Sequence, residues 1–175
     1  DANGKLLWGT EPIRLPALSA EEAWLMVDMM KDVVRRGTAA GAVGSVFPHP
    51  AGGKTGTTND GTDVWYIGYT TDLVAGVWMG LDKPERIKGN AQGGLLAAPA
   101  WAAFMNEVYR RKPAPPDWPR PAGIIQMTVD LVSSTQWTDG CPGIPATEFF
   151  IAGTEPVLSC SLMPGLLPDT LYYST

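Results

Sequence analysis

Three candidate strands follow one another closely between residues 51 and 81, and they limit the possible folds more than any other part of the sequence. Aromatic and β-branched residues are frequent in segments 64–69 and 73–81, and segment 51–57 combines threonine, glycine and lysine. The connections between them contain Asn59-Asp60-Gly61 and Thr70-Thr71-Asp72, which are turns of hairpin length. The sequence therefore predicts an antiparallel meander.

Two amphipathic helices are predicted on either side of this meander. Ser19 and Glu22 have the spacing of a capping box, and Gly37 marks the end of the first helix. A second helix is predicted from about residue 98 to residue 111, with Pro99 in its first turn. One stripe of this helix is expected to be core: Trp101, Phe104, Met105, Val108 and Tyr109.

The fold class predicted from these elements is α+β, with part of an antiparallel sheet flanked by helices and a small irregular tail. We expect residues 1–112 to form one unit, residues 113–123 a proline-rich linker and residues 124–175 a C-terminal extension. A turn and short strand are predicted within residues 1–8, a loop over residues 38–50, and strands at 126–132 and 148–152.

Composition narrows the classes of function. The chain has 175 residues, 45% of them hydrophobic, which is enough for a buried core, and a net charge of -5, which argues against nucleic acid as a partner. It holds no apolar run of the roughly 20 residues that span a bilayer. Because it begins at Asp1, we expect it to be part of a longer protein whose membrane anchor lies outside this chain.

Cys141 and Cys160 are the only cysteines and His49 is the only histidine. One disulfide is therefore possible, and it would favour an oxidising, extracytoplasmic compartment. Two unpaired thiols remain the alternative. We expect His49, between two prolines, to be a loop residue, and we predict neither a metal site nor a cofactor.

The segment Lys54-Thr55-Gly56-Thr57 carries the candidate chemistry. In a strand Lys54 would project to one face and Thr55 and Thr57 to the other, and strand twist could turn all three toward one cleft. Lys54 would supply a charge, the two hydroxyls would supply hydrogen bonds, and the Thr57 amide could face a developing oxyanion. The plainer interpretation is that Lys54 is a solvated lysine in a loop of glycine and threonine.

No nucleophile accompanies this segment. Lys-Thr-Gly is one of three signatures of penicillin-binding proteins and class A β-lactamases, the others being Ser-x-x-Lys and a serine triplet. None of the seven serines is followed by a lysine three residues later or an asparagine two residues later. A nucleotide-binding loop is disfavoured, because Pro48 occupies the position of its first glycine.

A longer stretch of sequence resembles a known family. The chain is similar to the C-terminal part of the transpeptidase domain of class A, bifunctional penicillin-binding proteins. The resemblance rests on the segments around the lysine motif, on both predicted helices and on the cysteine-bearing tail: residues 33–39, 51–60, 63–69, 73–82, 98–105 and 141–160.

The resemblance implies a membrane-anchored synthase that cross-links peptidoglycan by acyl transfer from D-alanyl-D-alanine stem peptides on the periplasmic side of the inner membrane, and that β-lactams inhibit. It implies that Lys54 and Thr57 are catalytic, and that Thr55, Gly56 and Thr57 bind substrate. Other cell-wall synthesis proteins are possible partners. Without a nucleophile, the chain alone is expected to be inactive.

Two alternatives remain open. A serine β-lactamase-like hydrolase shares the lysine motif and the fold. A non-catalytic module that binds peptide would also need no nucleophile. At the strand itself, one of Trp65 and Tyr66 should be core, because neighbouring residues of a strand face opposite sides, and the sequence leaves open which one.

Overall fold

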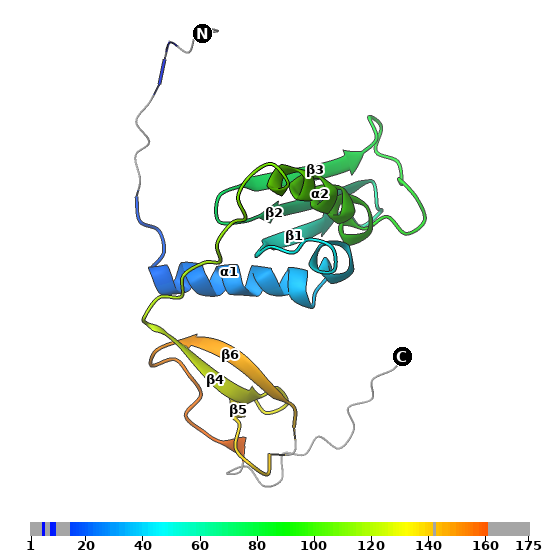
Figure 1. The fold of residues 1–175 in the computed structure, drawn as a ribbon. Helices are drawn as coiled ribbons and strands as arrows, with labels where there is room; N and C mark the ends of the chain where they lie inside the picture. Colours follow the sequence, from blue (N-terminus) through cyan, green and yellow to red (C-terminus); the bar gives the residue numbers. More distant parts are fainter. Residues whose placement is uncertain (1–4, 6–7, 10–14, 142, 161–175) are drawn as a thin grey trace.

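The computed structural model describes residues 5, 8–9, 15–141 and 143–160. Within these residues, two three-stranded antiparallel sheets lie on opposite sides of a long helix, and a second helix covers the first sheet (Figure 1). This arrangement confirms the predicted α+β class. Except for Lys5 and Trp8, the turn and strand predicted within residues 1–8 lie outside the described residues.

Helix α1 spans Ala20–Arg35 and begins where the capping box predicts. The Ser19 hydroxyl accepts from the Glu22 amide at 3.2 Å, and the Glu22 carboxylate accepts from the Ser19 amide at 2.8 Å. Two N–H groups that would otherwise lack partners are thereby satisfied. The helix stops just before Gly37, as predicted.

The loop predicted over residues 38–50 is wrong in part, because Ala40–Gly44 forms a π-helical turn, η1. Small residues allow this turn to pack closely against α1. A Cβ on Gly44 would lie 2.2 Å from the Val34 carbonyl oxygen, and Val43 is fully buried. The sequence did not predict this turn, because a segment rich in alanine and glycine has the composition of a loop.

The first sheet is the predicted meander. Strands β1 (Gly52–Thr57), β2 (Asp63–Tyr69) and β3 (Val74–Gly80) lie in the order β1-β2-β3, and all pairs are antiparallel. Strand β1 is therefore an edge strand with one side unpaired by any strand of the described chain.

Helix α2 spans Gly93–Tyr109, so the predicted start near residue 98 is wrong. Its first turn forms around Gln92, whose carbonyl oxygen accepts from the amides of Leu95 and Leu96 at 3.0 Å. The two glycines that follow Gln92 begin the helix, and Pro99 lies inside it. Trp101, Met105 and Tyr109 are buried as predicted, Val108 is only half-buried and Phe104 is 56% exposed, so the core stripe is narrower than expected.

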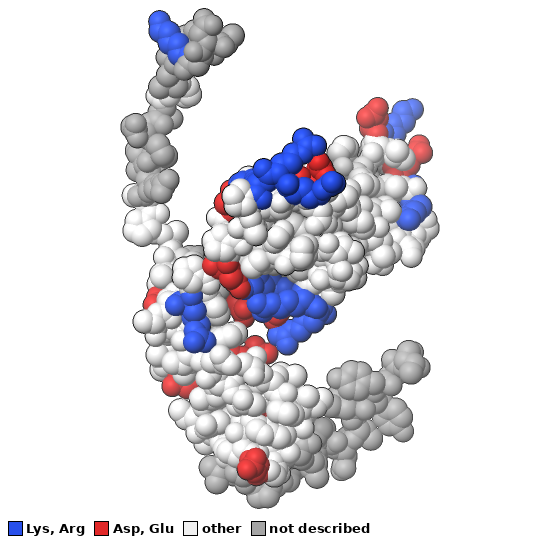
Figure 2. Space-filling view, viewed as in Figure 1, with Lys and Arg blue, Asp and Glu red and all other residues white. Residues whose placement is uncertain are grey.

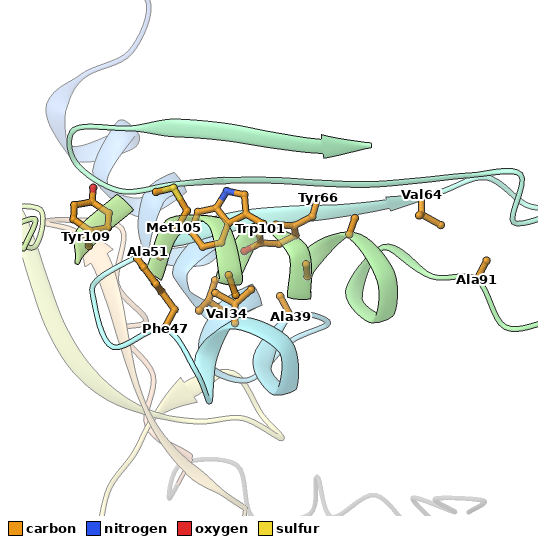
Figure 3. Close-up of a cluster of buried hydrophobic side chains, with 14 residues drawn as sticks. Val34, Ala39, Phe47, Ala51, Val64, Tyr66, Ala91, Trp101, Met105 and Tyr109 are labelled. Carbon is orange, nitrogen blue, oxygen red and sulfur yellow. The ribbon is translucent and has the colours of Figure 1, made fainter. Parts of the chain in front are cut away.

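The main core lies between α2 and the first sheet, where Trp101 and Tyr66 meet edge to face with ring centroids 5.4 Å apart (Figure 3). The Trp101 indole N–H donates to the carbonyl oxygens of Gly68 at 3.2 Å and Ala75 at 3.1 Å. Tyr66 is fully buried and Trp65 is 45% exposed, which answers the question that the sequence left open.

The second sheet contains β4 (Ile124–Asp130), β5 (Thr135–Gln136) and β6 (Pro145–Ile151) in the order β5-β4-β6. The two longer strands confirm those predicted, with starts two to three residues earlier. Strand β6 packs against α1, where Phe149 meets Trp24 at a centroid distance of 5.0 Å and Glu148 pairs with Arg36 at 3.4 Å.

The Asp130 carboxylate organises the loops of the second sheet. It accepts from the amides of Val132 and Ile144, each at 3.0 Å, and from the Ser133 hydroxyl at 2.8 Å. These hydrogen bonds, the Val132 amide first, hold the pKa of Asp130 below its ordinary value despite burial. A disulfide joins Cys141 to Cys160 beside this loop region, with 5.6 Å between their Cα atoms.

Charged side chains lie in small groups of mixed sign on the face shown in Figure 2, and much of that face is uncharged. The described residues include several ion pairs, such as Arg110 with Glu107 at 2.9 Å. Among the described residues, neither helix combines the length and the apolar character needed to cross a membrane.

Candidate functional site

Strand β1 separates Lys54 from the two threonines, as the alternation of a strand predicts. Thr55 lies opposite Tyr66 and Thr57 lies opposite Val64, and both partners are fully buried beneath α2. Cross-strand partners share a face. The threonine side chains therefore lie on the α2 side of the sheet, and Lys54 lies on the other side.

The open side of β1 presents backbone groups as well as side chains. The Thr58 amide donates to the Asp63 carbonyl at 3.0 Å, so this pair is hydrogen-bonded. Hydrogen-bonded and non-bonded pairs alternate along an antiparallel ladder. It follows that the amides of Thr55 and Thr57 point away from β2, toward the unpaired edge.

A cavity of about 440 Å³ adjoins this edge. Its walls come from β1 and the turn after it, from the turn that follows α1, and from the first turn of α2. The lining residues are Thr38, Thr55, Thr57, Thr58, Asn59, Gln92, Gly93, Gly94 and Leu95. The N-terminus of a helix carries partial positive charge, so it favours an anion in such a cavity.

The two glycines at the start of α2 permit this arrangement. A Cβ on Gly93 would lie 2.3 Å from the Trp65 carbonyl oxygen, and one on Gly94 would lie 2.2 Å from the Thr38 carbonyl oxygen. Because both positions lack a side chain, the helix can begin against the strand. The Gly93 amide then donates to the Thr57 hydroxyl at 3.0 Å.

Lys54 does not line this cavity. Its ammonium group bends around the edge of the strand and donates to the Thr55 carbonyl oxygen at 2.9 Å. It shares its face of the sheet with three half-exposed apolar side chains, Ile67 (48% exposed), Trp65 (45%) and Trp78 (49%). The structure thus brings Thr55 and Thr57 together and leaves the lysine on the opposite, open face.

A buried phenol lies directly behind the lysine motif. A Cβ on Gly53 would come within 2.3 Å of the Tyr66 hydroxyl, so only glycine leaves room for the ring at that position. This hydroxyl is buried without a hydrogen-bond partner among the described residues. Burial raises the pKa of Tyr66, so the phenol stays neutral and acts as packing beneath β1.

A second cavity, of about 330 Å³, continues the first around the β1–β2 turn. Arg86 and Lys88 are among its lining residues, and Arg86 donates a hydrogen bond to the Asp60 carbonyl oxygen at 3.1 Å. Elsewhere in the described chain, no three acidic, histidine or cysteine residues are grouped so that they could hold a metal ion.

Two known protein families match parts of this chain. The family described as "Penicillin binding protein transpeptidase domain" matches residues 9–106, which include the lysine motif, the first sheet and most of α2. The chain belongs to the penicillin-binding protein transpeptidase family. A second family, "Penicillin-binding protein 1A, C-terminal domain", matches residues 120–163, which include the second sheet.

Individual relatives of this chain are named penicillin-binding protein 1A. Penicillin-binding protein 1A of Pseudomonas aeruginosa is 35% identical over 87% of this chain, and that of Aquifex aeolicus is 34% identical over 95%. A crystal structure of penicillin-binding protein 1A from Haemophilus influenzae matches 81% of the chain with a TM-score of 0.68 and 29% identity. The chain spans about a fifth of these relatives, 18% and 22% of the two sequences and 22% of the crystallised chain.

The structure adds residues to the site that the sequence did not indicate. Thr38, Gly93 and Gly94 line the cavity, although Thr38 falls in the predicted loop of residues 38–50 and the two glycines precede the predicted start of the second helix. The adjacent glycines were the available signal, because two glycines beside an apolar helix indicate a close approach of backbones. No local pattern indicates Thr38.

Proposed function

We propose that this chain forms one wall of a D,D-transpeptidase site, which accepts the terminal carboxylate of a D-alanyl-D-alanine stem peptide or of a β-lactam. The observation that carries the proposal is the free edge of β1, where the amides of Thr55 and Thr57 face outward beside a cavity at the N-terminus of α2. A peptide or β-lactam can pair with such an edge as an added strand.

Each residue of the wall has a distinct role in the proposal. The hydroxyls of Thr55 and Thr57 bind the carboxylate, and Gly56 lets the substrate approach the backbone. The Thr57 amide is one donor of the oxyanion hole, where the loss of a single donor typically raises the barrier by about 3 kcal/mol. Lys54 lies on the open face, where it can join a hydrogen-bond network around a nucleophile supplied by the rest of the domain.

The nucleophile itself lies outside this chain in our proposal. In the reaction, a serine hydroxyl attacks the carbonyl carbon between the two D-alanines, the C–N bond breaks and D-alanine leaves with the proton as a free amine. The amine of a second stem peptide then attacks the acyl-enzyme and releases the serine. None of the seven serines here belongs to a Ser-x-x-Lys motif, so we expect the isolated chain to bind substrate without reacting.

We further propose that the chain comprises the end of the transpeptidase domain (residues 1–112), a linker (residues 113–123) and a C-terminal extension (residues 124–175). The longer protein would be anchored in the inner membrane, with this part on the periplasmic side. The disulfide between Cys141 and Cys160 supports an oxidising compartment. Peptidoglycan stem peptides would be its substrate, and other cell-wall synthesis proteins its partners.

Labelling with a fluorescent penicillin tests the proposal. We expect the longer protein to form a lasting acyl adduct and the isolated chain to form none. Lys54→Ala in the longer protein should slow acylation at least about a hundredfold, as loss of a transition-state contact does. Lys83→Ala, an exposed lysine outside the cavities, is the matched control. Acylation of the isolated chain, or a wild-type rate for Lys54→Ala, would refute these roles, and rapid loss of the adduct would indicate a hydrolase.

A further inference from the structure

Thr38 contacts Thr55, which with Thr57 forms the proposed carboxylate clamp. Its Oγ1 atom lies 2.9 Å from Thr55 Oγ1, and both side chains line the same cavity. Thr38 is 17 residues from Thr55 in the sequence and comes from the turn between α1 and η1 rather than from the sheet. The contact therefore joins two elements at the proposed substrate site.

The backbone around Thr38 is held in place on two sides. The absence of a side chain on Gly94 lets the first turn of α2 rest against the Thr38 carbonyl group. The next residue, Ala39, is fully buried, and its amide donates to the Val33 carbonyl oxygen at 3.0 Å. These contacts fix the place from which the Thr38 hydroxyl reaches Thr55.

The hydroxyl of Thr57 shows how a neighbouring donor sets the direction of a hydroxyl's hydrogen bonds. A backbone amide can only donate, so the 3.0 Å contact from Gly93 makes Thr57 Oγ1 an acceptor. The hydroxyl's own proton is then free to donate to another group. A ligand carboxylate in the cavity is an acceptor only, and it requires donors that point toward it.

We propose that Thr38 is a positioning residue that donates its hydroxyl proton to Thr55, so that Thr55 donates its own proton to the substrate carboxylate. The inference rests on the proposed function, because it assigns a direction to a hydrogen bond within that clamp. Each clamp hydroxyl then accepts a hydrogen bond: Thr55 from the Thr38 hydroxyl, and Thr57 from the Gly93 amide. Chained hydrogen bonds polarise one another, which strengthens the donor that faces the anion.

Acylation rates of the longer protein with benzylpenicillin and with its methyl ester test this direction. The ester lacks the anionic carboxylate. The ratio of the benzylpenicillin rate to the ester rate does not depend on the folded fraction of a variant. Thr38→Val removes the hydroxyl at nearly constant volume and should lower this ratio about fivefold to tenfold, the effect of one lost hydrogen bond. Thr38→Ser keeps a hydroxyl and should restore the ratio.

Thr55→Val and the double variant separate the possible failures. We expect Thr55→Val to lower the ratio, and Thr38→Val to add little to it, because Thr38 acts through Thr55. An unchanged ratio for Thr55→Val would overturn the carboxylate clamp itself. A lowered ratio for Thr55→Val with a wild-type ratio for Thr38→Val would overturn only the role of Thr38. Additive effects would also overturn it, since Thr38 would then act on the substrate independently.

Discussion

The two sheets of this chain are of equal strand number and are stabilised in different ways. The first is covered by α2, and fully buried Trp101, Tyr66 and Val64 form its core. The second has a thinner apolar layer, and its loops are tied by a buried carboxylate, Asp130, and a disulfide. The edge of the first sheet is unpaired by any strand of the described chain, whereas hydrogen bonds and the disulfide hold the loops of the second.

The proposed site belongs to the first sheet, and the second sheet packs against α1 through β6. Glu148 of β6 pairs with Arg36, two residues before Thr38. Because the second sheet lies apart from the cavity, changes in the core of the first sheet should disturb the cavity, and changes in the second sheet should leave it intact. Three perturbations test the difference, in order of expected effect.

Removing the largest buried side chain should give the largest effect. Trp101→Ala leaves a cavity beneath the first sheet and should lower the free energy of unfolding by about 3–5 kcal/mol. Phe104→Ala, on the exposed side of the same helix, should change it by less than about 0.5 kcal/mol. Urea unfolding followed by tryptophan fluorescence measures both, and equal losses would show that the core is not where α2 meets the sheet.

Removing the disulfide should affect only the second sheet. Cys141→Ser with Cys160→Ser opens a loop with a sequence separation of 19 residues and should lower the local stability of β4 and β6 by roughly 3 kcal/mol. Amide hydrogen exchange resolves the two sheets separately. A loss of protection in α2 as large as that in β4 would contradict their independence. Thiol titration of the unfolded, unreduced wild-type chain should find no free thiol.

Acid should affect the two sheets through different carboxylates. Hydrogen bonds, first from the Val132 amide, lower the pKa of Asp130, and hydrogen bonds from Lys112 and then Tyr109 lower the pKa of Asp72 to about 2. Each therefore stabilises the fold above its ordinary pKa near 4. For Asp72 this stabilisation is lost as the pH falls from about 4 toward 2, and for Asp130 it is lost as the pH falls below its ordinary pKa.

The matched variants are Asp130→Asn and Asp72→Asn. We expect the first to reduce the acid dependence of amide protection in β4, and the second to reduce it in the turn between β2 and β3. Each should leave the other sheet's acid dependence unchanged. A wild-type acid dependence in both variants would show that these carboxylates are not what links pH to stability.

Local patterns in the sequence predicted the first sheet and α1, because the capping box at Ser19 and the turn at Asn59 act through near neighbours. The start of α2 could not be predicted in the same way, since the helix begins where Gly93 and Gly94 meet distant backbone groups. The loops tied by Asp130 were equally hidden, because the carboxylate accepts from Ile144, 14 residues away.

The candidate site, like the fold, was predictable only where it depends on residues close together in the sequence. The lysine motif and the alternation of β1 placed Thr55 and Thr57 on one face and Lys54 on the other, as the register shows. The gathering of all three in one cleft, which strand twist made possible, is not seen in this chain. Thr38 belongs to the site because of a tertiary contact between the turn after α1 and β1, for which the sequence contains no periodic signal.

The central claim is that the free edge of β1 binds a D-alanyl-D-alanine terminus without any nucleophile in the chain. The most direct measurement is a titration of the isotopically labelled isolated chain with N-acetyl-D-alanyl-D-alanine, followed by the amide shifts in its NMR spectrum. We expect saturable shifts at Thr55, Thr57 and Gly93, and none in the second sheet. Shifts confined to the second sheet, or none at β1 at millimolar peptide, would contradict the claim.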